Sequence, residues 1–196
     1  MSVDQHALTR SLAELATSVP APATTLSHQL GVVVGAAAEL LGVDCVGVLL
    51  LDDRDHVRTV AASGPAAAAL ELVQEQLQLG PGIDVLTTGQ VLTVVDLAVE
   101  PGYRQLWSEL AGAGVRGVLS APVVVRGEIV GNLNLVTVQR HEWTAAERRA
   151  AAAFGDLIGQ LLRAATSAVH PGGPIGGGGA ATPDADPERE TEEPGP

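Results

Sequence analysis

The sequence predicts an α+β fold in which an antiparallel sheet lies between N-terminal and C-terminal helices. Long apolar stripes at helical spacing occur near both ends of the chain. Between them lie strand-like segments paired by short turns, an order that produces hairpins and not a doubly wound parallel sheet. We divide the 196 residues into a helical extension (1–22), a folded domain (23–168) and a Gly/Pro-rich acidic tail (169–196).

Two helices are expected at the N-terminal end. Three leucines at helical spacing predict a short helix over 5–17, and a second apolar stripe predicts a helix over 25–41. The apolar run 30–51 is 22 residues long, about the length of a membrane span. It contains Glu39 and Asp44, and its periodicity changes from helical to strand-like, so we interpret it as a buried helix followed by a buried strand.

The remaining elements follow from turn residues and periodicity. The expected strands cover 45–51, 57–62, 91–97, 115–125 and 128–138. The expected helices between them cover 65–79, 83–88 and 103–111. A final helix starts at a capping box, in which the Thr144 hydroxyl and the Glu147 carboxylate bind opposing backbone amides.

Composition excludes several classes of function. The chain has 11 basic residues, all arginine, against 23 acidic ones, for a net charge of −12. This balance argues against direct nucleic-acid binding and against attachment to an anionic membrane. One cysteine, Cys45, excludes an internal disulfide and any multi-cysteine metal or redox centre. The start lacks the pattern of a secretory signal, so we expect a cytoplasmic protein. Half of residues 171–196 are Gly or Pro, which predicts a disordered tail.

No constellation of catalytic residues is apparent in the sequence. The five histidines are dispersed, and none forms the helical pattern of a zinc site. His56 follows Asp55 in a predicted turn, where we expect solvated side chains, and Cys45 reads as a small core residue. We therefore expect no enzyme, no metal and no cofactor.

Two pairs of glycines lie four residues apart on helices: Gly31 with Gly35, and Gly155 with Gly159. Each pair leaves a smooth patch that allows close backbone approach. One interpretation is a dimer seam between two copies of the chain. The other is packing within one chain, either on the sheet or between the two helices.

Four further residues suggest either a pocket or local packing. Tyr103 and Trp107 would form a wall of a small-molecule pocket, or a clamp that holds their helix on the sheet, which we favour. Asn132 and Asn134 point to the same face of a strand, where they would bond neighbouring backbone, which we favour, or contact a ligand. Trp143 precedes the helix cap and is expected to be a structural anchor.

The stretch 70–97, LELVQEQLQLGPGIDVLTTGQVLTVVDL, resembles the middle of a GAF domain, and more narrowly the sensor half of bacterial GAF–ANTAR regulators. Three further stretches fit the same resemblance: 114–122, 129–135 and 143–162. It covers about 25–162. It implies terminal helices on one face of the sheet, a ligand pocket on the other and dimerisation through the terminal helices.

The sequence also departs from several GAF relatives. The Gly/Pro-rich tail stands where GAF–ANTAR regulators carry an RNA-binding module, so direct antitermination is not expected. The lysine-containing signature of cyclic-nucleotide GAF domains is absent. Cys45 alone does not match the several cysteines of methionine-sulfoxide-reducing relatives, nor the later cysteine of bilin-attaching ones.

The resemblance and the residues together predict a non-catalytic sensory or regulatory domain. It would bind a small cytoplasmic ligand beside segments 80–84 and 96–107 and signal as a homodimer through its helices. The candidate ligand-binding residues are Asp84, Asp96, Tyr103, Trp107 and Asn134. The alternative is an interaction or dimerisation module with a vestigial pocket, whose protein partner is a separate regulator.

Overall fold

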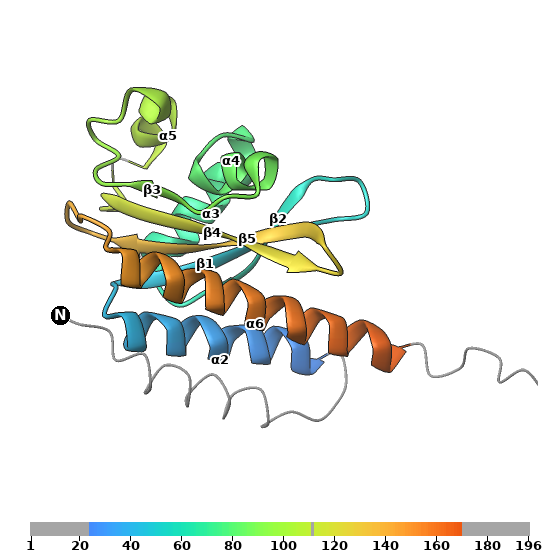
Figure 1. Ribbon diagram of the computed structural model, residues 1–196. Helices are drawn as coiled ribbons and strands as arrows, with labels where there is room; N and C mark the ends of the chain where they lie inside the picture. The colour runs from blue at the N-terminus through green and yellow to red at the C-terminus, as the bar shows by residue number, and fades with distance from the viewer. Residues whose placement is uncertain (1–23, 111, 170–196) are drawn as a thin grey trace, which may run out of the picture.

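A five-stranded antiparallel sheet forms the centre of the structure, with helices on both faces (Figure 1). The computed structural model describes residues 24–110 and 112–169. Its strands are β1 (Cys45–Leu51), β2 (Val57–Ala62), β3 (Leu92–Val94), β4 (Gly117–Val125) and β5 (Glu128–Thr137), in the spatial order β2-β1-β5-β4-β3. Its helices are α2 (Thr24–Leu41), α3 (Pro65–Leu77), α4 (Pro81–Thr88), the 3₁₀ turn η1 (Pro101–Tyr103), α5 (Arg104–Glu109) and α6 (Ala145–Val169).

Helices α2 and α6 run side by side beneath one face of the sheet (Figure 1). Alternate residues of β5, Leu133 and Leu135, point to this face and are fully buried there with Phe154 of α6. The α2 side of the same core includes Val34 and Ala37, both fully buried. This layer buries one side of α2 and most of β1, while the other side of α2 is exposed at Gly31 and Val32.

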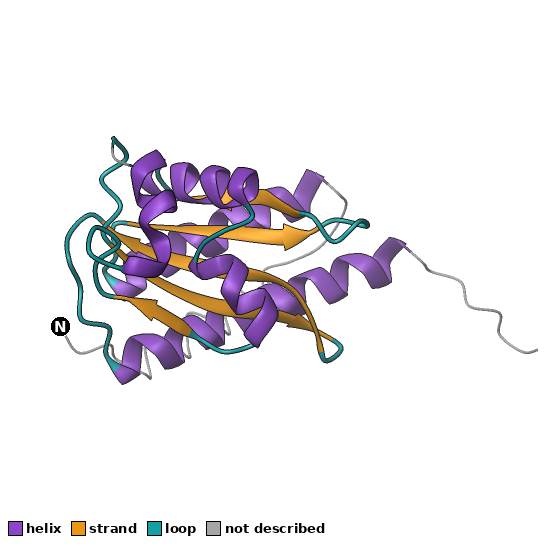
Figure 2. Cartoon of the chain, turned by 90° about the horizontal axis from the view of Figure 1, so that it is seen from above, coloured by secondary structure: helices purple, strands orange, loops and turns teal. Residues whose placement is uncertain are grey.

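The shorter helices α3, α4 and α5 cover the opposite face, which Figure 2 shows from their side. At one end of this face, a second apolar core joins Leu70 of α3 and Leu106 of α5 to Val118 and Val136 of the sheet. The middle of the face is polar. The predicted α+β class, with terminal helices on one face, is confirmed.

Several element boundaries differ from those predicted. Helix α3 ends at Leu77 because Gln78 adopts a left-handed conformation with φ 50°. Helix α4 begins at Pro81, which the first turn of a helix accommodates because no N–H is needed there. The strand expected over 91–97 shortens to Leu92–Val94, and Asp96 instead closes a turn by accepting a hydrogen bond from the Ala98 amide.

Among the remaining predictions, one helix differs in form and the features at the start of α6 are confirmed. The helix expected over 103–111 is a 3₁₀ turn followed by the six residues of α5. The capping box is confirmed, since Thr144 N donates to Glu147 Oε2 at 2.7 Å and Glu147 N donates to Thr144 Oγ1 at 3.2 Å. Trp143 is a buried anchor whose Nε1 donates to the Val94 carbonyl at 3.1 Å.

The helix expected over 5–17 and the tail expected over 171–196 lie outside the described residues. Among the helices that are described, none combines the length and the apolarity needed to cross a membrane.

Candidate functional site

Five polar side chains lie together on the sheet face beneath α3 and α4, and all five are 0% exposed. They are Glu71, Gln74, Ser120, Asn132 and Asn134, and we call them the polar cluster. Full burial of one carboxyl and three carboxamides is unusual, because a buried polar group without a partner costs free energy. The cluster is therefore the candidate functional site.

The register of the strands brings Ser120, Asn132 and Asn134 close together on one face of the sheet. Asn134 of β5 pairs with Gly47 of β1 on one side and with Ser120 of β4 on the other. Asn132 lies two residues away on the same face, between Leu49 and Pro122. The intervening residues of each strand face the α2–α6 core.

Helix α3 supplies the one carboxyl group of the polar cluster, that of Glu71. Its buried face carries Ala67 and Leu70, and the same face continues through Glu71 and Gln74 at helical spacing. The apolar part of α3 packs in the second core, so the polar part is held over the middle of the sheet.

A continuous hydrogen-bond chain joins four members of the polar cluster. Asn134 Nδ2 donates to both carboxyl oxygens of Glu71 at 2.8 Å, and Ser120 Oγ donates to Asn134 Oδ1. Gln74 Nε2 donates to Glu71 Oε2 at 3.0 Å. Gln74 Oε1 in turn accepts from the backbone amide of Gly82 at 2.8 Å, which links the cluster to the start of α4.

Gly47 allows the Glu71 carboxyl to lie directly on the sheet. A Cβ built at Gly47 would fall 2.1 Å from Glu71 Oε1. No larger residue fits at this position without displacing the carboxyl group. The absence of a side chain on β1 is thus part of the site.

Burial raises the pKa of Glu71 to about 8, and the hydrogen bonds from Asn134 and Gln74 oppose this effect without cancelling it. Within the part of the chain that the structure describes, no arginine or histidine is buried. The cluster therefore holds its carboxyl in the neutral, protonated form at neutral pH.

Asn132 differs from the other members because neither its Nδ2 nor its Oδ1 has a hydrogen-bond partner among the described residues. Gly82 of α4 lies directly over it, and a Cβ built at Gly82 would fall 2.6 Å from Asn132 Nδ2. The expectation that Asn132 and Asn134 bond neighbouring backbone is wrong. Asn134 bonds side chains, and Asn132 bonds no described group.

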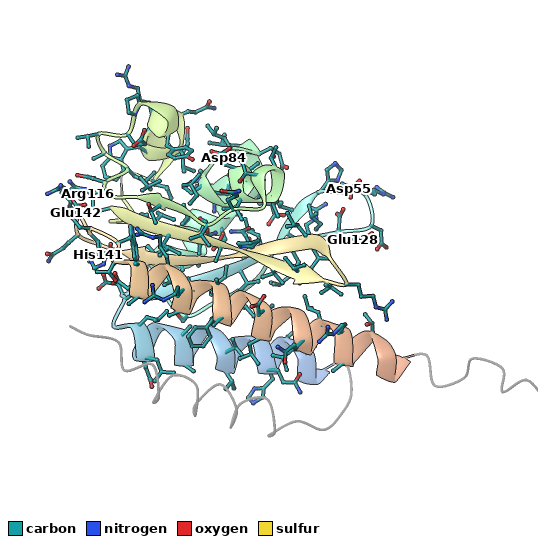
Figure 3. All side chains as sticks on the ribbon, viewed as in Figure 1. Asp55, Asp84, Arg116, Glu128, His141 and Glu142 are labelled. Atoms are coloured by element: carbon teal, nitrogen blue, oxygen red, sulfur yellow. The ribbon has the colours of Figure 1, made fainter. Side chains whose placement is uncertain are left out.

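Two predicted ligand residues, Asp84 and Tyr103, contact each other outside the cluster. The Tyr103 hydroxyl donates to Asp84 Oδ2, which ties η1 to α4. Burial, followed by this bond, raises the pKa of Tyr103. Figure 3 labels Asp84 on α4, above the sheet.

The other predicted pair, Asp96 and Trp107, meets through Arg116. Arg116 Nε and Nη2 donate to the two carboxylate oxygens of Asp96 at 2.7 and 2.5 Å, and its Cζ lies 5.8 Å from the centre of the Trp107 ring. The hydrogen bond from Arg116 lowers the pKa of Asp96. In Figure 3, Arg116 lies at one end of the sheet, far from the hairpin turns that carry Asp55 and Glu128. These contacts favour the clamp interpretation of the η1–α5 segment.

The two glycine pairs have different surroundings. A Cβ at Gly155 would fall 2.4 Å from the Pro122 carbonyl oxygen, and one at Gly159 would fall 2.2 Å from that of Val124. This pair lets α6 approach the β4 backbone within one chain. Gly31 and Gly35 of α2 have no atom within 4 Å of a built Cβ among the described residues, so no described element packs closely on these two positions.

The remaining candidates have structural surroundings. Cys45 is buried, its Sγ accepts a hydrogen bond from the Ala67 amide, and burial raises the pKa of its thiol. His56 is exposed in the β1–β2 turn. Residues 24–110 and 112–169 contain no group of three His, Cys, Asp or Glu placed to hold a metal ion.

A shallow surface groove of about 280 Å³ lies elsewhere, between α6 and the β4–β5 turn. Its lining includes Arg126, Asp156 and Gln160. It shares no residue with the polar cluster or with the predicted pocket segments.

Sequence reasoning missed Glu71, Gln74 and Ser120. A signal for the first two was present, because both lie on the helical stripe that Ala67 and Leu70 define. A carboxyl and an amide on the buried face of a helix indicate a polar site beneath it. Ser120 had no comparable signal, since its role depends on the pairing of β4 with β5.

Solved structures share this fold at low sequence identity. The GAF domain of an Acinetobacter phosphoenolpyruvate-protein phosphotransferase is 20% identical with a TM-score of 0.65, covering 89% of this chain and 99% of that one. The free methionine-R-sulfoxide reductase of Neisseria meningitidis, solved with its substrate, is 16% identical with a TM-score of 0.65 (86% and 96% covered). Residues 122 to 287 of a methyl-accepting chemotaxis protein are 18% identical with a TM-score of 0.61 (80% and 97% covered).

The same fold thus serves both signalling proteins and an enzyme. No curated protein matches this chain in sequence. Residues 23–163 match the family of GAF domains, and this match spans most of the chain and all of the sheet. The chain therefore belongs to the GAF domain family.

Proposed function

We propose that this protein is a non-catalytic sensory domain that binds a small ligand at the polar cluster. GAF domains are sensory and regulatory. The observation that carries the proposal is Asn132, whose fully buried carboxamide has no partner among the described residues. A folded domain seldom leaves both ends of a buried amide unpaired, and a bound molecule would pair them.

Ligand entry requires the start of α4 to move. Gly82 covers Asn132 and is held by the hydrogen bond from its amide to Gln74 Oε1. The other tie on α4 is the bond between Asp84 and Tyr103. We propose that α4 is the lid of the site and that these two ties, together with the burial of Pro81 and Val85, set the cost of opening.

Strand β5 offers a route from the site to the helices. Asn132 and Asn134 face the polar cluster, while Leu133 and Leu135 on the same strand pack in the α2–α6 core. A ligand that shifts β5 would change the packing of both helices, because a close-packed core does not absorb displacement locally.

The proposed output is a homodimer formed through α2. Its outward side carries Gly31, which is exposed, and Val32, whose side chain is 45% exposed. We place the seam on α2 and not at Gly155 and Gly159, because those two glycines pack against β4 within one chain. From the resemblance to GAF–ANTAR sensors, we propose that the dimer acts in transcription regulation in the bacterial cytoplasm through a protein partner.

Native mass spectrometry of the untagged full chain, purified from its own host, tests the proposal. We expect a dimer that carries extra mass, which is lost on denaturation and in Asn132→Val. The matched control is Gln76→Ala, which removes an exposed amide from α3 and should leave the extra mass in place. A bare chain in the wild type, under conditions that preserve non-covalent complexes, would contradict ligand binding.

The second candidate is an interaction module whose pocket is vestigial. It is favoured by the closure of the polar cluster, in which Glu71, Gln74, Ser120 and Asn134 already bond one another. A bare dimer that dissociates in Gly31→Leu, together with no ligand in any preparation, would support this candidate.

A further inference from the structure

The chemistry of the polar cluster restricts the class of ligand that it accepts. Four observations bear on this: the charge of the groups that face the cluster, the hydrogen-bonding capacity left on Asn132, the shape of the roof above Asn132 and the apolar groups beside it. The ligand class inferred below rests on the proposed function, since both concern the same site.

The first observation is the absence of a buried cation among the described residues. Every described arginine is exposed except Arg116, which is half-buried and pairs with Asp96. His141 is half-buried and pairs with Glu147, and the other described histidines are exposed. A ligand carboxylate or phosphate would therefore enter a buried site without a counter-charge and beside the Glu71 carboxyl, which is strongly unfavourable.

The second observation is the unused capacity of Asn132. Its carboxamide offers N–H donors on Nδ2 and an acceptor on Oδ1, all within one plane, and none is used by a described group. A complementary ligand edge presents an acceptor and a donor side by side. Primary amides, lactams and pyrimidinone rings have this edge, and asparagine pairs with the donor–acceptor edge of adenine in the same bidentate way.

The third observation is the roof. Gly80 and Gly82 have no side chains to place between α4 and the cluster, and a Cβ at either would collide with Gln74 Oε1 or Asn132 Nδ2. The roof directly over Asn132 is therefore peptide backbone and not a side chain. A flat group is the shape that needs the smallest displacement of this backbone roof.

The fourth observation is the strand neighbours of Asn132, which are Leu49 and Pro122. Both are apolar, and Leu49 is fully buried. They provide nonpolar contact for a ring without adding a charged or polar partner.

From these observations, we propose that the ligand is an uncharged, planar molecule with an adjacent hydrogen-bond donor and acceptor, such as a primary amide or lactam, and that the site rejects anions.

Matched probe pairs that differ in charge test this proposal on the full-length chain. Nicotinamide is compared with nicotinate, and uracil with orotate, by isothermal titration calorimetry and thermal shift at neutral pH. We expect each neutral probe to bind at least about tenfold more tightly than its anionic partner. The free energy needed to bury an unpaired charge exceeds the free energy that corresponds to a tenfold change in affinity. The proposal would be overturned if either anion bound as tightly as its neutral partner or more tightly. It would also be overturned if neither neutral probe bound.

Variants locate the binding. Asn132→Val should abolish binding of the neutral probes, whereas the exposed-amide control Gln76→Ala should not change it. Where Asn132→Val does not fold, Asn132→Ser serves, since it keeps a small polar group but loses the donor–acceptor edge. Neutral-probe binding that survives both substitutions would overturn the assignment to Asn132.

The outcome for the ligand class can be separated from that for the proposed function. A molecule retained from the host that carries a phosphate or carboxylate would overturn the uncharged class and leave a ligand-binding sensor standing. If no mass is retained from the host and no probe binds, both the uncharged ligand class and the ligand-binding function are overturned.

Discussion

Asn134 and Glu71 are 63 positions apart in the chain, and the Asn134 carboxamide lies 2.8 Å from both oxygens of the Glu71 carboxyl. This contact joins the middle strand of the sheet to the helix above it. The stability of the polar cluster depends on whether the Glu71 carboxyl is protonated, because this carboxyl is fully buried.

Glu71→Gln should change how the stability of the domain depends on pH. Burial raises the folded-state pKa of Glu71 to about 8, so the folded chain binds more protons than the unfolded chain between about pH 4.5 and 8. The contribution of Glu71 to stability is therefore complete below the unfolded pKa and is lost as the pH rises through about 8. We expect the wild type to lose up to about 1.4 kcal/mol per pH unit across this window relative to Glu71→Gln.

The measurement is denaturant unfolding at a series of pH values. Glu109→Gln, which neutralises an exposed glutamate on α5, is the control and should track the wild type. Parallel pH profiles for the wild type and Glu71→Gln would contradict a protonated Glu71.

Gly47→Ala should destabilise the domain by about 1–3 kcal/mol, because its Cβ would fall 2.1 Å from Glu71 Oε1. The collision involves the Glu71 side chain, so the penalty should shrink when Glu71→Ala is already present. A double-mutant cycle by chemical denaturation measures this coupling. Additive effects would show that Gly47 is required for some other reason.

Asn132→Val should raise the free energy of unfolding of the ligand-free chain by about 1 kcal/mol. The substitution removes a buried amide without a described partner and places a β-branched residue on a strand. A gain in stability that accompanies a loss of ligand is typical of a residue kept for binding. A marked loss of stability would instead indicate a structural role for Asn132.

The glycine pairs should respond in opposite ways to alanine. Gly155→Ala and Gly159→Ala place a Cβ against backbone carbonyls of β4. Each should lower the free energy of unfolding by at least roughly 1–3 kcal/mol. Gly31→Ala, where no described atom lies within 4 Å of a built Cβ, should gain roughly 0.5–1 kcal/mol from helix propensity. Thermal unfolding compares them. Sedimentation velocity of Gly31→Leu then asks whether this side of α2 forms the dimer.

Tyr103 should titrate at a higher pH in the folded chain than in denaturant. The sequence has one tyrosine, so ultraviolet difference absorbance reports this residue directly. Burial, followed by the hydrogen bond to Asp84, raises its pKa. Asp84→Asn should lower the folded midpoint toward the denatured one without reaching it, since burial remains. Coincident folded and denatured titrations would show that η1 is not held against α4.

The sequence by itself determined the local elements and their order. Helical spacing located α2 and α6, the capping box located the start of α6, and alternation placed Asn132 and Asn134 on one face of β5. These features depend on residues within a few positions of one another, and short-range periodicity records them. The resemblance carried by the segments around them pointed to the family that the comparisons established.

Only the tertiary structure decided what lies opposite these residues. The pairing of β5 with β1 set Gly47 beside Asn134, and the packing of α3 laid Glu71 over both. The same holds for Gly155, whose smooth surface proved to face β4. Contacts between distant segments depend on strand register and on how helices settle on the sheet, and neither is encoded in the spacing of nearby residues.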